Sequence, residues 1–480
     1  MEKKWDAVVL TASDVAQKKA FEMQLEMLPR LQDYAEKYFV YEDTPAGVRI
    51  GSGGSTILAL NRLTDYYKKE FSIKKILIIH SGGLSQRLPV ASALGKVFLL
   101  LPGEKTMLEM KLIFYRPILH AMLAGVVISA SDTLEFIPEN IGSIIPGEVT
   151  LFAHPSSIKV AMEHGVYVLK DGSLETVLQK PTLEELKESG ALSPNSDLPI
   201  SEDLYGAHEL EGDEHALTDS FFVLSSAIAL HLASLKVHEP FDCETCCYGD
   251  FLRALGTFPQ TKYLETHEPL ATWRQRFASI FRGLSCRVVV LPQNSFFHFG
   301  TPQEIFKHLI PNSVFCRRFG IPTQHYLLSS ITDDSKIGET SFAEWSYFPS
   351  GVSVGDKSLI SDLSSLEYVE FPPSIMAMTL ILIGSNGSSE YVTAIFSTDD
   401  DIKVKKNTLK WFKEELHYEK PTSLWEAKIF KVCSSPEESL KATLLSVKDG
   451  LNSDSCISFS EALLRKDVVK MVDFRKDRIP

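Results

Sequence analysis

A glycine pair near residue 80 is the first feature of this sequence whose residue types suit chemistry. Residues 80–89 read His-Ser-Gly-Gly-Leu-Ser-Gln-Arg-Leu-Pro. Because Gly82 and Gly83 have no side chains, backbone N–H groups at this point can approach an anion closely. The segment is therefore a candidate phosphate-binding loop.

Three polar side chains in and after this loop add a hydroxyl and positive charge. Ser85 can donate a hydrogen bond, Arg87 can hold phosphate oxygens with its planar guanidinium, and Lys96 can supply a point charge. The spacing matches neither a Walker loop nor a Gly-x-Gly-x-x-Gly fingerprint. Taken alone, the segment fits a phosphate site and an ordinary glycine turn before a surface Arg and Lys equally well.

A second glycine-rich segment, Gly-Ser-Gly-Gly-Ser-Thr over residues 51–56, repeats the order of strand, glycines and helix. We expect a strand at 48–50 and a helix with apolar residues from Ile57 onward. Ser55 or Thr56 would then cap the helix and leave free N–H groups at the positive end of its dipole. One glycine segment would hold a triphosphate and the other would shape a base pocket. The candidate nucleotide-binding residues of this segment are Gly51, Gly53, Gly54 and Ser55.

Two aspartates are candidates for holding a divalent cation. Transfer of a phosphoryl or nucleotidyl group needs charge neutralisation, usually by Mg²⁺ on carboxylates. Asp132 follows the strand expected at 126–129, at a carboxyl strand end where open α/β sheets bind ligands. Asp219 stands just before the strand expected at 221–224. Each aspartate also fits a structural role at a strand end or a helix cap.

The elements that must position these residues alternate between strand and helix over residues 1–310. This alternation predicts an α/β domain with a mostly parallel, Rossmann-like sheet. The strongest strand is 76–79, since an apolar, largely β-branched run suits the middle of a covered sheet. Other strands are expected at 7–10, 126–129, 149–153, 166–169 and 221–224. Helices are expected at 15–34 with a bend at Pro29, at 108–123 and at 183–188.

Residues 311–480 follow a different pattern, with apolar residues spaced six apart. The spacing runs through Ile331, Ile337 and Ala343, and again through Phe348, Val354, Ile360 and Leu366. A six-residue period is typical of a hexapeptide β-helix, so we expect a β-helix-like domain with a mixed α/β tail. An antiparallel β-domain with accidental spacing is the alternative. In the tail, 409–416 and 460–465 indicate helices and 427–432 a strand.

The bulk composition is that of a folded protein of two or more domains. The chain has 480 residues, 44% of them apolar and 23% charged, with a formal net charge of −13. This acidic bias argues against coating nucleic acid or an anionic membrane. No window is long and apolar enough to predict a membrane span, and the first residues show no hydrophobic stretch that would predict a signal peptide. Seven cysteines without a disulfide pattern fit a reducing, cytoplasmic location.

Several stretches together resemble one known family. Gly82-Gly83-x-Ser85-x-Arg87 with Lys96 looks like a variant of the signature loop of sugar nucleotidyltransferases. Residues 51–56 and 79–89 are similar to the fucose-1-phosphate guanylyltransferase family in particular, as are 153–157, 164–166, 248–252, 298–301 and 424–430. The resemblance implies a nucleotidyltransferase domain, a C-terminal left-handed β-helix-like domain, and formation of GDP-L-fucose and pyrophosphate from GTP and L-fucose 1-phosphate.

The same resemblance implies roles for further residues. Lys180, in Gln-Lys-Pro, is similar to a Lys-Pro element that contacts the sugar phosphate, and Asp250 would help to bind the sugar. An aspartate in the position of Asp132 holds the metal in the wider group. The sugar phosphate is itself an anionic nucleophile, so catalysis needs positioning and charge stabilisation rather than a general base.

Alternatives stay open at this point. Guanine and fucose specificity follow from resemblance alone, so another sugar 1-phosphate is an alternative substrate. A nucleotidyltransferase-like regulatory subunit without turnover is the alternative from a different class, although Arg87, Lys96 and Asp132 together favour an enzyme. The C-terminal domain is a candidate surface for a homo-oligomer.

Overall fold

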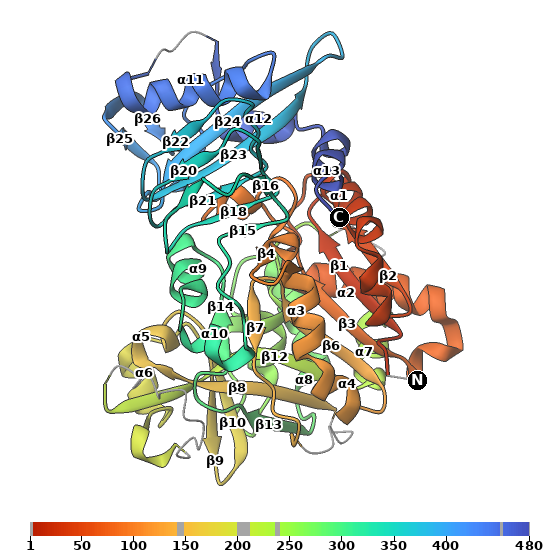
Figure 1. Ribbon diagram of the computed structural model, residues 1–480. Helices are drawn as coiled ribbons and strands as arrows, with labels where there is room; N and C mark the ends of the chain where they lie inside the picture. Colours follow the sequence, from red (N-terminus) through yellow and green to blue (C-terminus); the bar gives the residue numbers. More distant parts are fainter. Residues whose placement is uncertain (1–2, 142–147, 199–211, 236–240, 452–454, 480) are drawn as a thin grey trace. The chain divides into compact units, whose positions relative to one another are not determined.

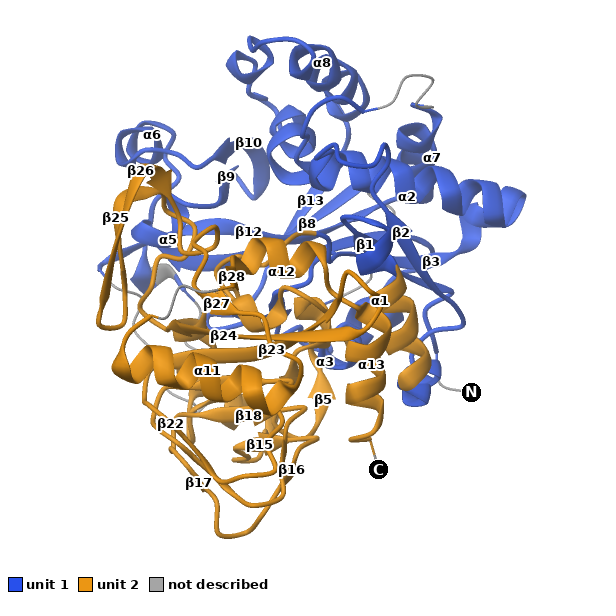
Figure 2. Ribbon diagram, turned by 90° about the horizontal axis from the view of Figure 1, so that it is seen from above, with its two compact units in different colours: residues 1–18, 28–82, 109–297 blue, residues 19–27, 83–108, 298–480 orange. Residues whose placement is uncertain are grey.

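The computed structural model describes residues 3–141, 148–198, 212–235, 241–451 and 455–479. They group into two compact units, coloured separately in Figure 2. Unit 1 comprises Met1–Lys18, Leu28–Gly82 and Glu109–Phe297, and unit 2 comprises Lys19–Met27, Gly83–Leu108 and His298–Pro480. The division differs from a single boundary at residue 310, because two segments from the N-terminal part group with unit 2.

Unit 1 is built on a ten-stranded sheet whose main path runs β10-β9-β12-β6-β3-β1-β2 (Figure 1). The strands on this path are β1 (Ala7–Ala12), β2 (Tyr38–Glu42), β3 (Lys75–His80), β6 (Gly125–Ala130), β9 (Gly165–Lys170), β10 (Ser173–Gln179) and β12 (Glu214–Leu224). Off the path lie β8 (Val149–Ser157), β11 (Ser193–Pro194) and β13 (Cys286–Val290). Neighbours among β2, β1, β3 and β6 are parallel, whereas β12 is antiparallel to β6. The carboxyl ends of the parallel strands therefore meet at one edge.

The sheet forms because its central strands are apolar on both faces. Residues Ile76–Ile79 of β3 are fully buried, as expected for a covered parallel strand. The helices α2 (Gly51–Tyr67), α7 (Ser226–Ser234) and α8 (Leu270–Phe281) contribute to the core on one face. On the opposite side Tyr115 packs against Phe221, with ring centroids 4.8 Å apart.

Most of the expected elements of unit 1 are confirmed, and one strand is wrong. The long helix is α1 (Val15–Met27) followed after Leu28 by a short 3₁₀ helix, so the break at Pro29 is where proline predicts it. The helix at 183–188 is α6 (Leu183–Glu188), capped by Thr182. Residues 48–50 form no strand, and the strand next to β1 is β2.

Unit 2 contains short parallel strands that stack with a constant offset along the chain. Tyr326 pairs with Ala343, Ala343 with Ile360, and Ile360 with Ala377. The strands of this face are β15 (Tyr326–Leu327), β18 (Phe342–Glu344), β21 (Leu359–Ser361) and β23 (Ile375–Ile383). Two further parallel stacks are β16 (Ser330–Ile331) with β19 (Tyr347–Phe348), and β17 (Lys336–Ile337) with β20 (Val352–Val354) and β22 (Val369–Phe371). The same offset along the chain recurs in all three stacks.

The rest of unit 2 is mixed α/β. Strand β24 (Ser389–Ser397) is antiparallel to β23, and the helices are α9 (Pro302–Leu309), α10 (Val314–Phe319), α11 (Pro436–Asp449), α12 (Phe459–Leu464) and α13 (Val468–Lys476). The helix expected at 409–416 is wrong, because the segment is a hairpin of β25 (Lys406–Trp411) and β26 (Glu414–Thr422). Its side chains alternate, with Leu409 and Trp411 buried and Lys410 exposed, which is the period of a strand. The expected strand at 427–432 is confined to β27 (Phe430–Lys431).

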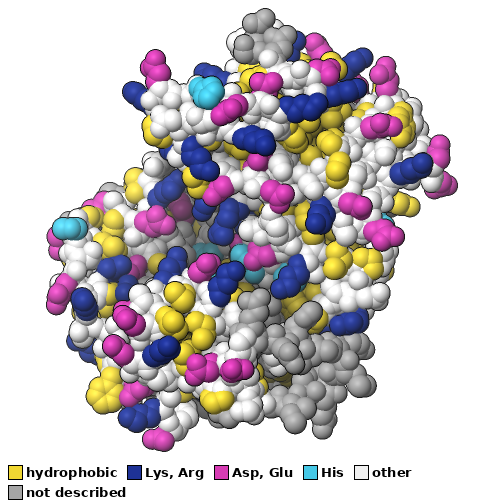
Figure 3. All heavy atoms as spheres, turned by 90° about the vertical axis from the view of Figure 1, so that its left-hand side faces the viewer, with side chains coloured by type: hydrophobic (Ala, Val, Ile, Leu, Met, Phe, Trp, Pro, Cys, Tyr) yellow, Lys and Arg dark blue, Asp and Glu magenta, His cyan; other side chains and the backbone are white. Residues whose placement is uncertain are grey.

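The surface mixes charges, and no helix among the described residues is long and apolar enough to cross a bilayer. On the face drawn in Figure 3, Lys and Arg side chains are interspersed with Asp and Glu. That face presents no extended surface of a single sign.

A buried glutamate in β18 makes the stability of unit 2 depend on pH. The Glu344 side chain accepts hydrogen bonds from Leu100 N at 2.8 Å and from the Ser361 hydroxyl at 2.8 Å. Burial raises the pKa of Glu344 to about 7, although Arg475 partly opposes the shift. The folded state therefore binds a proton at Glu344 more tightly than the unfolded chain does. The stabilisation that this proton gives is complete at pH values below the pKa of the unfolded chain, and it is lost as the pH rises through the folded-state pKa of about 7.

We expect the free energy of unfolding to fall by about 2–3 kcal/mol more between pH 5 and pH 8 in the native protein than in Glu344→Gln. Urea unfolding at the two pH values measures this difference. Equal pH slopes in the two proteins would show that Glu344 is ionised throughout.

Candidate functional site

The candidate phosphate loop follows β3, and its first residues are hydrogen-bonded to the carboxyl end of β1. The Thr11 hydroxyl accepts hydrogen bonds from Ser81 N at 3.1 Å and Gly82 N at 3.4 Å. A side chain on Gly82 would lie 3.2 Å from Ser13 N, so glycine lets the loop cross β1 closely. His80 ends β3, and burial lowers its pKa to about 4, so its ring is neutral at pH 7.

The second glycine segment is the start of α2 and not a loop before it. Helix α2 begins at Gly51, its N-cap is Ile50, and no side chain caps it. The expected cap at Ser55 or Thr56 is therefore wrong. The Ser55 hydroxyl donates to Asp43 Oδ1 at 2.6 Å, and the Thr56 hydroxyl lies 3.0 Å from His80 Nε2. These two side chains instead tie α2 to the ends of β2 and β3.

The glycines of α2 allow another backbone segment to pack against the helix start. A Cβ on Gly51 would lie 2.2 Å from Thr245 O, and one on Gly53 would lie 2.7 Å from the Thr245 hydroxyl. Gly53 N also donates to Thr245 O at 2.9 Å. On Gly54 a Cβ would come within 2.8 Å of Ile50 Cβ. Close packing therefore accounts for these glycines, and their nucleotide contact stays a prediction.

Replacing Gly51 with alanine tests this packing role. Gly51 has φ +68° and no room for a side chain, whereas Gly47 has φ +82° with nothing within 4 Å of its Cβ position. We expect Gly51→Ala to lower the free energy of unfolding by about 2–4 kcal/mol and Gly47→Ala by about 1 kcal/mol. Urea denaturation measures both. Unchanged stability of Gly51→Ala with a large rise in the KM for GTP would favour a ligand contact instead.

Asp219 lies inside β12 and not before the strand as expected. Its side chain is 11% exposed, and Oδ1 accepts from Gly165 N at 3.1 Å. A Cβ on Gly165 would stand 2.4 Å from Asp219 Oδ2, so only glycine fits there. Burial raises the pKa of Asp219 to about 7, and the charge of Lys180 acts in the opposite direction. The structure thus brings two predicted site residues, Asp219 and Lys180, close enough for the charge of one to affect the pKa of the other.

Lys180 is held by the backbone of the segment before β9. Its N–H donates to His164 O at 2.9 Å, and its φ of +47° is unusual for a side chain other than glycine. His164 Nδ1 lies 3.9 Å from Asp219 Oδ1. The end of β10 therefore delivers Lys180 to the end of β9 at which Asp219 stands.

Among the buried side-chain N and O atoms that have no hydrogen-bond partner in the part of the chain that the structure describes, four lie on or beside the strands that carry Asp219 and Lys180. They are Tyr167 OH, Gln179 Oε1, Ser220 Oγ and Tyr248 OH. Three of them belong near Asp219: its charge acts on both tyrosines, and a Cβ on Gly165 would lie 3.3 Å from Gln179 Oε1. Buried polar groups are normally paired, so such a group points to a polar ligand.

Sequence reasoning missed these groups because chain-distant pairings assemble them. Gln179 stands next to the predicted Lys180, and Tyr248 opens the Tyr-Gly-Asp stretch. The family resemblance covers both stretches, so it is the signal by which these two residues could have been found. The family resemblance does not include Tyr167 or Ser220, so nothing in the sequence indicated these two residues.

Asp250 has its carboxylate occupied by neighbouring groups of the chain. Oδ2 accepts from Cys246 N at 2.7 Å, and Oδ1 accepts from Arg274 Nε at 2.7 Å. The side chain is 5% exposed. These contacts fix the turn at Cys247–Phe251, so a sugar hydroxyl would have to compete with Arg274 for this carboxylate.

Asp132 lies in the turn between β6 and β7 (Thr133–Glu135) and is half-buried. Strand β12 is antiparallel to β6, with Phe222 opposite Ile128. Residues that precede Phe222 therefore lie beside those that follow Ile128, which puts Asp219 and Asp132 at the same end of neighbouring strands. The two aspartates are therefore candidates for one site at this end of the strands.

The remainder of the candidate phosphate loop belongs to unit 2. Gly83 has φ +119° with nothing within 4 Å of its Cβ position, and Ser85 has φ +48°. Ser85 O accepts from Leu88 N at 2.8 Å, which closes a tight turn. Arg87 is exposed and makes no side-chain hydrogen bond or salt bridge with the described residues. Its guanidinium is therefore available to an anion.

Lys96 follows a glycine bend in the same unit. Gly95 has φ +93°, and the Lys96 ammonium donates to Gly300 O at 3.4 Å. Just before the bend, Leu94 O accepts from Gln24 Nε2 at 2.9 Å. The segment that carries Lys96 is thus fixed by its backbone.

Comparison with known proteins gives consistent matches. A family model described as Fucose pyrophosphorylase domain matches residues 68–435. The fucose-1-phosphate guanylyltransferases of Mus musculus and Homo sapiens are 31% and 32% identical to this chain, over 98% of it and over 92% and 90% of their own lengths. Among solved structures, HddC from Yersinia pseudotuberculosis complexed with GMP-PN is 11% identical at a TM-score of 0.25, covering 65% of this chain and 99% of that one. A score this low carries no structural argument.

Proposed function

The chain belongs to the fucose pyrophosphorylase family, and from this premise we propose that it joins GTP to L-fucose 1-phosphate, forming GDP-L-fucose and pyrophosphate. The observation that carries the proposal within the fold is the set of unpartnered buried polar groups beside Asp219. Tyr167, Gln179 and Tyr248 offer hydroxyl and carbonyl groups, which suit the hydroxyls of a sugar. Lys180 stands at the same place to neutralise the phosphate of that sugar.

The reaction is a direct displacement at the α-phosphorus of GTP. A phosphate oxygen of the sugar 1-phosphate forms a bond to that phosphorus, the bond to the bridging oxygen of the β-phosphate breaks, and pyrophosphate leaves with the electron pair. The nucleophile is already an anion, so no side chain has to remove a proton. We assign Arg87 and Lys96 to the triphosphate, where their charges offset the charge that develops on the leaving group.

The nucleotide-binding glycines have different expected roles. We assign Gly83 and Ser85 to a phosphate, since the backbone at Gly83 carries no side chain and nothing lies within 4 Å of its Cβ position. Gly82 supports this loop through its close approach to β1. Gly51 and Gly53 act through the packing of Thr245, and Ser55 acts through Asp43.

Magnesium is the cofactor we propose, held by Asp132 and Asp219. Mg²⁺ keeps several waters and is bound by one or two carboxylates together with substrate phosphates. Two carboxylates at the same end of neighbouring strands, together with substrate phosphates, would supply the oxygen ligands of such a site. Bound there, the ion would neutralise triphosphate charge, while Asp132 and Asp219 fix its place at the sheet edge.

We also propose that unit 2 contains a short β-helix and that the protein is cytoplasmic. The stacked strands from Tyr326 to Phe371 are consistent with a short β-helix, supported by their repeated pairing in three faces. All seven cysteines are free thiols, which supports a reducing, cytoplasmic location.

Pyrophosphate release tests the proposed reaction. The purified chain with Mg²⁺ is given GTP, UTP or ATP, each with the 1-phosphates of fucose, mannose, glucose and N-acetylglucosamine. We expect turnover with GTP and fucose 1-phosphate. Turnover only with another pair would contradict the substrate assignment. Nucleotide binding without turnover in any pair would favour a regulatory subunit.

A further inference from the structure

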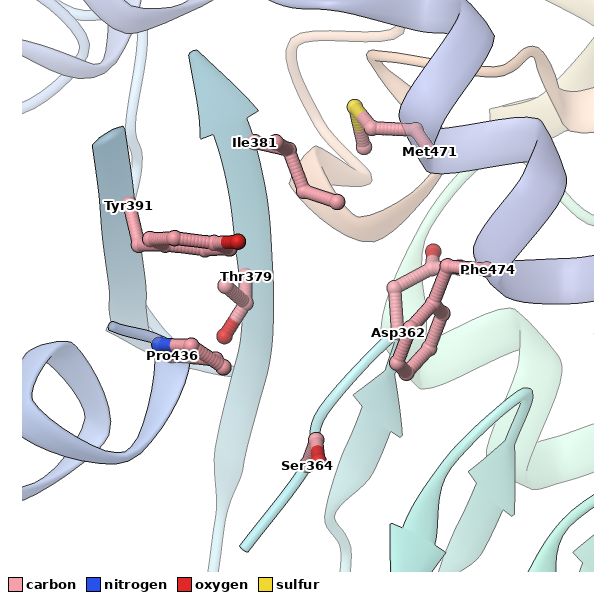
Figure 4. Close-up of a pocket in the computed structure, with 8 residues that line it drawn as sticks. All are labelled: Asp362, Ser364, Thr379, Ile381, Tyr391, Pro436, Met471 and Phe474. Carbon is pink, nitrogen blue, oxygen red and sulfur yellow. The ribbon is translucent and has the colours of Figure 1, made fainter. Parts of the chain in front are cut away.

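A small pocket in unit 2 lies between the stacked strands and the C-terminal helix (Figure 4). Its lining comes from β23, β24, the start of α11, helix α13 and the segment after β21. The lining residues are Asp362, Ser364, Thr379, Ile381, Tyr391, Pro436, Met471 and Phe474. The cavity is about 110 Å³. By the usual allowance of about 10–15 Å³ for each water, it holds a ligand the size of one sugar ring and not a nucleotide sugar.

The polar groups of this pocket are suited to a ligand with hydroxyls. The Tyr391 hydroxyl points into the cavity in Figure 4. Neither this hydroxyl nor that of Ser364 hydrogen-bonds to any residue that the structure describes. Asp362 Oδ2 already accepts from Arg475 and from the Ser361 hydroxyl, whereas Oδ1 accepts from Arg475 alone and can take one more hydrogen bond. Three separate groups can therefore bind ligand hydroxyls.

The charge and the apolar walls favour a neutral ligand with an apolar face. Arg475 holds Asp362 through two bonds, Nε to Oδ1 at 2.7 Å and Nη2 to Oδ2 at 2.6 Å. The pair is neutral as a whole, so the pocket favours neither an anion nor a cation. Ile381 and Phe474 supply an apolar surface of the kind that packs against the C–H face of a sugar ring.

The same aspartate is connected to the segment that carries Lys96. Arg475 also donates from Nη1 to Gln24 Oε1 at 3.0 Å, and Gln24 Nε2 donates to Leu94 O at 2.9 Å. Gln24 and Arg475 are 0% and 2% exposed. Asp362, Arg475, Gln24 and Leu94 O form a buried relay, and Leu94 stands two residues before Lys96.

We propose that this pocket is a regulatory site for a neutral monosaccharide, and that its occupant acts on Lys96 through the relay. A sugar hydroxyl bonded to Asp362 holds the relay in its fully bonded arrangement, and so holds the Lys96 segment. The consequence for GTP rests on the proposed function, in which Lys96 binds the triphosphate. Because coupling between two binding sites is reciprocal, GTP and the sugar then strengthen each other's binding.

Calorimetric titration of the full chain with L-fucose, D-mannose, D-galactose and D-glucose tests the site without any turnover. We expect at least one sugar to bind, and its affinity to fall about two- to ten-fold in Tyr391→Phe and in Ser364→Ala, the loss that one hydrogen bond predicts. Tyr368→Phe, at an exposed tyrosine outside the pocket, is the matched control with no loss. Sugar binding that is equal in all four proteins, or no sugar binding at all, would overturn the site. Binding of indole with no sugar binding would assign the pocket to an apolar ligand instead.

Repeating the titration with GTP present tests the coupling. We expect saturating GTP to raise the sugar affinity at least ~two-fold in the native chain and to leave it unchanged in Gln24→Met, where the relay is cut. An equal effect of GTP in both proteins, or no effect in the native chain, would overturn the regulatory role. The first titration does not use GTP, so failure of the proposed reaction would leave the sugar site standing.

Discussion

Replacing Lys96 with methionine is expected to lower kcat by about two to three orders of magnitude while the protein stays folded. Methionine keeps the length and apolar stem of the side chain and removes only its charge. The structure favours this separation of effects because backbone hydrogen bonds hold the Lys96 segment in addition to the contact of the ammonium group with Gly300 O. Leu94 O accepts from Gln24, and Leu99 N donates to Lys96 O at 3.0 Å.

The measurement is steady-state pyrophosphate release together with urea unfolding. Lys105→Met is the matched control, since Lys105 is a half-buried lysine in the same unit and has no assigned role. We expect its kcat to change by less than about two-fold. A native kcat in Lys96→Met would remove Lys96 from the triphosphate site. A parallel loss of stability would mean that the lysine has a structural role.

The strands that carry this site could be predicted because their signal is local. The run 76–79 is apolar on both faces, and burial within a covered sheet is the simplest fate of such a run. The strand at 126–129 has the same character. The hairpin at 406–422 was expected to be partly helical because Leu409, Trp411 and Leu416 fit either period over so short a stretch. Pairing between β25 and β26 decides the structure, and pairing is not visible in one segment.

The surroundings of the site residues were harder to predict than the strands, because contacts between segments far apart in the sequence determine them. Gly51 and Gly53 are predicted to bind a nucleotide, and that contact stays a prediction, but the close approach of the backbone at Thr245 is a packing role that the sequence did not show. The two segments are far apart along the chain, so no spacing rule relates them. Asp219 was expected before its strand because the residues ahead of Phe221 are polar, yet pairing with β8 and β9 extends β12 through them.

A buried ion pair beneath Asp132 leads to the second large effect. Lys111, on α3 (Met107–Phe114), is 1% exposed, and its ammonium donates to Glu135 Oε2 at 3.1 Å, Ser129 Oγ at 2.8 Å and Thr133 Oγ1 at 3.3 Å. Burial lowers the pKa of Lys111, and the charge of Glu135 opposes that shift. Ser129 and Thr133 stand on either side of Asp132, so Lys111 fixes both ends of the turn that carries it.

Lys111→Met is expected to lower the free energy of unfolding by about 3–5 kcal/mol, because it leaves the Glu135 carboxylate buried without its cation. Lys111→Met combined with Glu135→Gln removes both charges and should recover at least half of that loss. Urea unfolding measures both proteins. Lys170→Met is the control: it breaks a surface pair with Glu175 in the same unit and should cost less than about 1 kcal/mol.

The Lys111→Met, Glu135→Gln variant also distinguishes an effect on stability from an effect on catalysis. The introduced methionine has no donor to replace the ammonium bonds to Ser129 and Thr133, so the Asp132 turn is released although the core is neutral again. We therefore expect the folded Lys111→Met, Glu135→Gln protein to need a higher Mg²⁺ concentration for half-maximal turnover, by about ten-fold, as when an outer-shell partner of a metal ligand is lost. A native Mg²⁺ requirement in that stable protein would show that the buried pair serves the fold alone, and that Asp132 keeps its position without it.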